Sequence, residues 1–146
     1  MNADKSGLID GDISERVLAA FYEVYNELGA GFLESVYESA MVHVLAGMGL
    51  EVERQASLPV YFRGHLVGDF RADLLVADRL VVEIKAVSQL VQAHEVQLVN
   101  YLKASGHPAG LLLNFGPKPQ FKRRVHSNPL FNPRSSASIR VKEPNV

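Results

Sequence analysis

The segment RADLLVADRLVVEIK, residues 71–85, gives the clearest indication of the fold of this chain. It contains two apolar runs typical of β-strands, and both runs carry charged residues near their middle. Side chains alternate between the two faces of a strand, so one face of each run is expected to be apolar. These faces comprise Phe70, Ala72, Leu74 and Val76 in the first strand, and Leu80, Val82, Ile84 and Ala86 in the second.

The charged residues of this stretch predict a metal site between the two strands. If residues 77–79 form a three-residue hairpin loop, Leu74 pairs with Val82 and Asp73 lies opposite Glu83. Two facing carboxylates destabilise a sheet unless a cation compensates them, and Mg²⁺ prefers such oxygen ligands. Lys85 would project to the same side as Glu83. The alternative is a solvated sheet face with alternating charges, which is common in antiparallel sheets.

The bulk composition indicates one soluble domain. A chain of 146 residues can bury a core without cross-links, and the absence of cysteine favours a reducing, cytoplasmic location. No apolar run approaches the length of a membrane span, and the N-terminus lacks a signal pattern. Residues 1–117 hold 8 Lys/Arg and 15 Asp/Glu, whereas residues 118–146 hold 7 and 1. The basic tail is expected to contact either a polyanion such as nucleic acid or the acidic body itself.

Periodicity and turn residues predict the remaining elements. Apolar residues at helical spacing predict helices over residues 12–28, 32–48 and 91–104. Strands are expected over residues 58–63, 66–76, 80–87, 109–115 and 121–125, with Gly64-His65 as the first turn. The apolar strand 109–115 should pair parallel to strand 80–87 across a helical crossover. We therefore expect a domain over residues 12–126 and a basic, loosely ordered extension over residues 127–146.

Several residues of the predicted helices stand out. In the second helix, Glu34 has a structural explanation as an acid near the helix N-terminus, and His43 is expected to be partly buried. Val91, Leu98 and Leu102 of the third helix should face the core, with His94, Gln97 and Tyr101 together on another side. The first helix carries three apolar residues that could cover a homodimer seam: Phe21, Val24 and Tyr25.

The order of elements resembles the core of the PD-(D/E)xK nuclease superfamily, an α/β restriction-endonuclease-like fold in which helices flank a mixed sheet. Asp73 followed by Glu83-Ile84-Lys85 resembles its D…(D/E)xK signature. Residues 97–101, QLVNY, look like the QhxxY element of the RecB-like branch. Residues 31–37, GFLESVY, resemble the signature of the GxxExxY family of single-domain bacterial proteins. The resemblance covers about residues 13–125.

This resemblance implies a set of site residues. Asp73 and Glu83 would be the metal-binding carboxylates, with the backbone carbonyl of Ile84 beside them and Glu34 as the acid from the N-terminal helix. The metal would be Mg²⁺ or Mn²⁺. Lys85 would hold the attacking water or stabilise the transition state, and Gln97 and Tyr101 would orient the phosphate or the water. The last three residues also have ordinary structural explanations. Lys85 could merely neutralise Glu83, Gln97 could be a solvated helix residue, and Tyr101 could be a core aromatic.

Three functions remain open at this point. The first is a metal-dependent phosphodiesterase that hydrolyses nucleic acid, with DNA favoured over RNA. The second is a non-catalytic module that binds nucleic acid or protein on the same scaffold. The third is an interaction protein without a nucleic-acid role. Since the body is acidic, phosphate affinity would have to come from the tail and from Arg54, Arg63 and Arg71.

Overall fold

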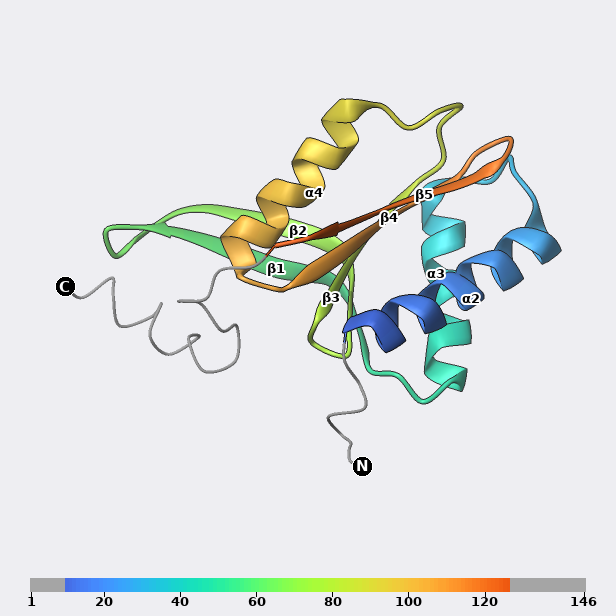
Figure 1. Cartoon of the computed structure of the whole chain (residues 1–146), viewed down its shortest axis with the longest axis horizontal. Helices are drawn as coiled ribbons and strands as arrows, with labels where there is room; N and C mark the ends of the chain where they lie inside the picture. The colour runs from blue at the N-terminus through green and yellow to red at the C-terminus, as the bar shows by residue number, and fades with distance from the viewer. Residues whose placement is uncertain (1–9, 127–146) are drawn as a thin grey trace.

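The computed structural model describes residues 10–126, which form three helices and five strands (Figure 1). In chain order these are α2 (Asp10–Leu28), α3 (Glu34–Gly47), β1 (Val52–Phe62), β2 (His65–Val76), β3 (Leu80–Lys85), α4 (Gln92–Ser105), β4 (Ala109–Phe115) and β5 (Pro119–Val125). This order confirms the predicted α/β arrangement. The extension expected over residues 127–146 lies outside the described residues.

The strands form one mixed sheet in the order β1-β2-β3-β4-β5. β3 and β4 are parallel, as predicted, and every other neighbouring pair is antiparallel. The register of the β2–β3 hairpin is also as predicted, with Leu74 opposite Val82 and Val76 opposite Leu80. Parallel pairing places α4, which connects β3 to β4, across one face of the sheet.

The helices cover both faces of the sheet, with α2 and α3 on one side and α4 on the other (Figure 1). Leu74, Val82 and Leu111 pack with the buried side chains of α2 and α3. Val81 and Leu112 pack instead with Leu98 and Leu102 of α4 and others. β3 and β4 are buried on both faces, which explains their near-continuous apolar sequences.

The prediction that Ala72 and Leu74 share one apolar face of β2 is wrong, because the alternation of side chains is interrupted at Asp73 between them. Ala72 packs in the core under α4, whereas Leu74 packs in the core under α2 and α3. In the pairing of β1 with β2, Arg54 lies opposite Leu74 and Ala56 lies opposite Ala72. Gln55, between the two pairs, has a φ of 49°. A left-handed residue in a strand increases its local twist and redirects the side chains that follow. Phe70 is 38% exposed rather than a core residue, and its ring contacts Tyr101 of α4.

Other local predictions need smaller corrections. β1 begins at Val52, and its turn with β2 consists of Arg63 and Gly64, both with positive φ, so the turn lies one residue earlier than expected. Two consecutive positive φ values match the type I′ turn that suits a twisted hairpin. Val91 is exposed because it precedes the first turn of α4, and His43 is exposed on α3.

The residues predicted to form a homodimer seam on the first helix make contacts within their own chain instead. Phe21 and Val24 are buried in the core of their own chain. The Tyr25 hydroxyl contacts the backbone carbonyls of Gly116 and Pro117, each 2.8 Å away. Phe21 and Val24 are therefore not available to a second copy, and the partly buried Tyr25 anchors α2 to the β4–β5 loop. No helix within residues 10–126 is long and apolar enough to cross a membrane.

Candidate functional site

Asp73 and Glu83 meet where β2 and β3 separate. The regular backbone pairing of β2 with β3 ends at Leu74 and Val82. Beyond this pair, backbone N–H groups of the two strands donate to side-chain carboxylates instead of to backbone carbonyls. The Asp73 N–H donates to Glu83 Oε2 at 2.9 Å, and the Ile84 N–H donates to Asp73 Oδ2 at 2.7 Å. Each carboxylate is thus held by the strand that carries the other. This exchange orients both acids toward one point between the strands.

Burial makes this pair electrostatically unusual. Burial, and then the nearby Asp73 charge, raise the pKa of Glu83 to about 8, although the Asp73 N–H and Lys85 act in the opposite direction. Burial also raises the pKa of Asp73, and Glu38 and Glu34 add to the effect, while the Ile84 N–H opposes it. Two neighbouring carboxyls with raised pKa values form a site that favours either a shared proton or a bound cation.

Lys85 lies at the end of β3, two residues after Glu83, and is partly buried. Alternation along β3 places Glu83 and Lys85 on the face covered by α4, since Val81 on that face packs against α4 residues. The Lys85 charge lowers the pKa of Glu83, in opposition to the larger effect of burial. Two acids and one lysine therefore lie on the adjacent strands β2 and β3.

α4 adds a tyrosine beside the carboxyls. Tyr101 is 8% exposed, and its ring lies 5.0 Å from the ring of Phe70 on β2. Burial raises the pKa of Tyr101, and the charges of Glu83 and Asp73 raise it further. Its hydroxyl is therefore a hydrogen-bond donor at neutral pH. Gln97 is exposed one helical turn before Tyr101, on the same side of α4.

α3 contributes a residue that the sequence reasoning missed. Glu38 Oε1 accepts from Gln55 Nε2 at 3.0 Å, and Gln55 Nε2 lies 3.4 Å from Asp73 Oδ1. Glu38 Oε2 also pairs with Arg54 Nε at 3.1 Å. Glu38 raises the pKa of Asp73 more strongly than Glu34 does. The signal was available, because Glu38 follows Glu34 by four residues and shares its helix face.

The side chains present suit a hard divalent cation. Asp73 and Glu83 each use one oxygen on a backbone N–H, and the second oxygen of Asp73 accepts only a long, 3.4 Å hydrogen bond from Gln55. Since a carboxylate oxygen has two lone pairs, both acids keep acceptor capacity for a ligand. One or two carboxylates completed by water are what Mg²⁺ requires, and a cation would offset the repulsion that raises the Glu83 pKa. Within residues 10–126, no three His, Asp or Glu side chains gather closely enough to hold an ion by themselves. The donor set is thus a two-carboxylate set.

Tyr37, which lies in the GFLESVY segment, has a structural role. It is fully buried, and its ring stacks on Phe115 with centroids 4.2 Å apart. Its hydroxyl donates to the Gly29 carbonyl at 2.5 Å and accepts from the Phe32 N–H at 3.2 Å. Tyr37 therefore fixes the loop between α2 and α3 against the end of the sheet.

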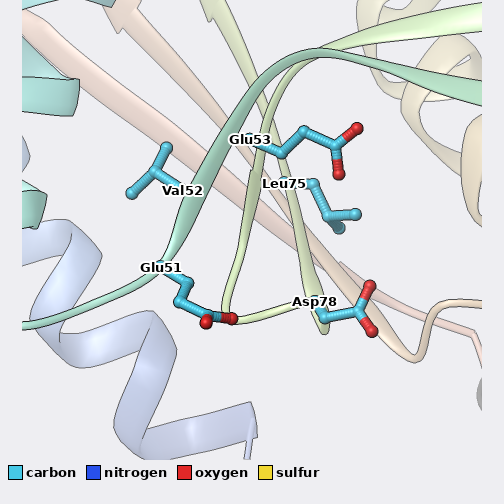
Figure 2. Close-up of a pocket in the computed structure, with 5 residues that line it drawn as sticks. All are labelled: Glu51, Val52, Glu53, Leu75 and Asp78. Atoms are coloured by element: carbon cyan, nitrogen blue, oxygen red, sulfur yellow. The ribbon is translucent and has the colours of Figure 1, made fainter.

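A hollow of about 500 Å³ lies at the other end of β3, beside the β2–β3 turn. Figure 2 shows Glu53, Leu75 and Asp78 projecting to one side of the strands, with Val52 on the opposite side. Its charged lining residues, Glu51, Glu53 and Asp78, are all acidic. An acidic lining repels phosphate, so this hollow does not suit a polyanion.

Comparisons with known proteins agree with the observed fold. The family model described as "PD-(D/E)XK nuclease superfamily" matches residues 11–125. A comparison with curated proteins found no match. Among solved structures, the chain is similar to the crystal structure of SSO0001, with a TM-score of 0.52 and 18% sequence identity. That similarity covers 76% of this chain but only 55% of SSO0001, so the two share a fold over about half of the longer protein.

Proposed function

Because the chain belongs to the PD-(D/E)XK nuclease superfamily, we propose that it is a divalent-metal-dependent nuclease that hydrolyses phosphodiester bonds, with DNA as its substrate. The observation that carries the proposal is the reciprocal bonding of Asp73 and Glu83 beside Lys85. Within the superfamily, residues 31–37 support membership of the GxxExxY family. The lack of cysteine supports a cytoplasmic location.

Asp73 and Glu83 would hold Mg²⁺ or Mn²⁺, together with the backbone carbonyl of Ile84. A cation held there would supply Lewis acidity, which lowers the pKa of water and offsets charge that develops on the phosphate. Lys85, fixed on the rigid β3, supplies a positive charge next to the carboxyls and would donate to a phosphate oxygen or to the attacking water.

The residues around this centre would position it. Tyr101 presents a neutral hydroxyl close to both carboxyls and would hydrogen-bond a phosphate oxygen. Gln97, one turn earlier, would contact the same backbone from the exposed side of α4. Glu38 would orient Asp73 through Gln55, whereas Glu34 would act on the site through its charge.

Two observations favour a second candidate, a non-catalytic nucleic-acid- or protein-binding module on this scaffold. Within the described part of the chain, α3 brings no third acid close enough to complete a metal-holding group. Moreover, Arg54, a candidate phosphate contact, is paired with Glu38. In this case the protein would bind its partner without cleaving it.

Titration of the protein with Mg²⁺ and Mn²⁺ by isothermal calorimetry tests the metal site. We expect saturable binding to the unsubstituted protein and at least about tenfold weaker binding to Asp73→Asn, because the substitution removes a charged ligand. Asp69→Asn is the matched control, since Asp69 lies on the same strand but accepts a hydrogen bond from Ser57, 2.6 Å away. Equal affinities for all three proteins would contradict the proposed ligands.

The raised pKa of Glu83 predicts a specific pH dependence of stability without metal. Between pH 4.5 and about 8 the folded protein keeps the Glu83 proton that the unfolded chain has released. Unfolding then releases a proton, so the free energy of unfolding falls as pH rises, by up to about 1.4 kcal/mol per pH unit. Glu83→Gln removes this contribution.

Urea denaturation in a metal chelator, at intervals from pH 5.5 to pH 8.5, measures this dependence. The difference in unfolding free energy between Glu83→Gln and the unsubstituted protein should grow in favour of the variant as pH rises toward about 8, and level off above it. A difference that stays constant across this range would show that Glu83 ionises normally.

A further inference from the structure

A second hollow, of about 370 Å³, begins where the proposed catalytic strand ends. Ala86, Val87 and Ser88, which directly follow Lys85, line one side of it. The α2–α3 loop contributes Ala30, Gly31 and Phe32, and the β4–β5 segment contributes Phe115, Gly116 and Pro117. Figure 1 shows these loops gathered at the same end of the sheet. We refer to these nine residues as the β3-end hollow.

Phe32 forms an aromatic rim on the β3-end hollow. It is 47% exposed, which is unusual for a phenylalanine next to a packed core. Its position is nevertheless defined, because its N–H donates to the hydroxyl of the buried Tyr37 and the two rings meet edge to face at 6.0 Å. Gly31 before it has a φ of 112°, a conformation that other residues rarely adopt. The loop therefore presents an aromatic ring to the solvent in a fixed place.

Hydrogen bonds and close packing also fix the side of the hollow that Val87 and Gly116 form. The fully buried Asn114 accepts from the Val87 N–H and donates to the Val87 carbonyl, both at 2.9 Å. Gly116 lies so close that a Cβ atom there would come within 2.2 Å of the Val87 oxygen. A rigid wall on one side and a fixed aromatic ring on the other define a preformed hollow.

The chemistry of the lining identifies its occupant. None of the nine lining residues is charged, so the hollow suits neither a metal ion nor a charged side chain. Its apolar and backbone surface suits a flat, neutral, weakly polar ring. Lys85 lies two residues from Val87, about 7 Å along an extended chain, and supplies the charge complementary to a phosphate attached to such a ring.

We propose that the β3-end hollow binds an unpaired nucleobase, which stacks on Phe32 while its backbone phosphate contacts Lys85. This inference rests on the proposed nuclease function and specifies its substrate as single-stranded nucleic acid or an unpaired end. In a duplex the base edges are paired and the base faces are stacked, so a base can enter only after it is unstacked.

Binding of a fluorescein-labelled single-stranded oligothymidylate, measured by fluorescence anisotropy, tests the proposal. All proteins carry Asp73→Asn so that the probe is not consumed, which keeps this readout separate from cleavage. Adding Phe32→Ala should raise the Kd about tenfold, because base–aromatic stacking accounts for a difference of this size. Phe32→Tyr should keep the Kd within about twofold, because the ring remains.

Leu33→Ala is the matched control, since Leu33 is 77% exposed next to Phe32 but does not line the hollow. It should leave the Kd unchanged, and Phe32→Ala should not alter binding of the corresponding duplex. The proposal is overturned if Phe32→Ala binds the single-stranded probe with the Kd of its parent. It is also overturned if Leu33→Ala raises that Kd as much as Phe32→Ala does, or if Phe32→Ala weakens duplex binding to the same extent. If the Asp73→Asn parent binds neither probe, both this inference and the nucleic-acid function fail. Normal probe binding by the Asp73→Asn parent, together with no Mg²⁺ or Mn²⁺ binding by the unsubstituted protein, would contradict the nuclease mechanism alone.

Discussion

Asp73→Asn and Lys85→Ala are each expected to reduce phosphodiester cleavage by at least about a hundredfold, because each removes a charge beside the scissile phosphate. Asp73→Asn eliminates a carboxylate that would hold the cation, and Lys85→Ala eliminates the cationic group two residues from Glu83. Neither change deletes a large core side chain, since Asp73 and Lys85 are both only partly buried. Both variants should therefore remain folded.

The measurement is the cleavage rate of labelled single- and double-stranded DNA in Mg²⁺ or Mn²⁺, with circular dichroism to verify folding. Asp69→Asn serves again as the control, because its carboxylate bonds Ser57 outside the site. Cleavage that survives in both Asp73→Asn and Lys85→Ala would assign the activity to a contaminant or to another site. Absence of cleavage in the unsubstituted protein, combined with intact DNA binding, would favour the non-catalytic module.

Phe115→Ala is expected to lower the free energy of unfolding by about 3–5 kcal/mol, the range typical of a buried phenylalanine. Phe115 is 1% exposed and contacts aromatic rings from both helices on its side of the sheet. It stacks on Tyr37 at 4.2 Å and meets Phe21 edge to face at 4.8 Å. Since small domains are stable by only about 5–15 kcal/mol, this loss would be a large share of the total.

Urea denaturation of Phe115→Ala and of Phe121→Ala measures the effect with a matched control. Phe121 lies on the neighbouring strand β5, opposite Leu113, but is 39% exposed. Its replacement should cost less than about 1.5 kcal/mol, because much less apolar surface is withdrawn from water there. Similar losses for both variants would show that the aromatic cluster around Phe115 contributes no particular stability.

Much of the fold was predictable from local patterns. The apolar run of residues 109–115 predicted β4 at its observed limits, and the hairpin over residues 71–85 predicted the β2–β3 register. Both follow from rules that act over a few residues: alternation, turn length and burial of long apolar runs. The first turn was misplaced by one residue, because Arg63-Gly64 and Gly64-His65 are both acceptable turn pairs by composition.

The candidate site was predictable only in part. Asp73, Glu83 and Lys85 could be selected because charged residues inside apolar strands require an explanation. Glu38 shares the helix face of Glu34, which is a signal in the sequence, but its link to Asp73 through Gln55 joins three separate elements and is visible only in the structure. The interrupted face of β2 was also hidden, since it depends on the left-handed conformation of Gln55 on another strand.

Local patterns in the sequence were enough to predict the order of helices and strands, the parallel β3–β4 pair and the two acids beside a lysine, since these depend on neighbours in the chain. The protonation of those acids depends instead on tertiary contacts. The pKa of Glu83 rises to about 8 because other elements remove water from it and because Asp73 comes from a different strand. The β3-end hollow likewise exists only where loops distant in sequence meet. Burial and electrostatic coupling depend on distances in space, which chain position alone does not specify.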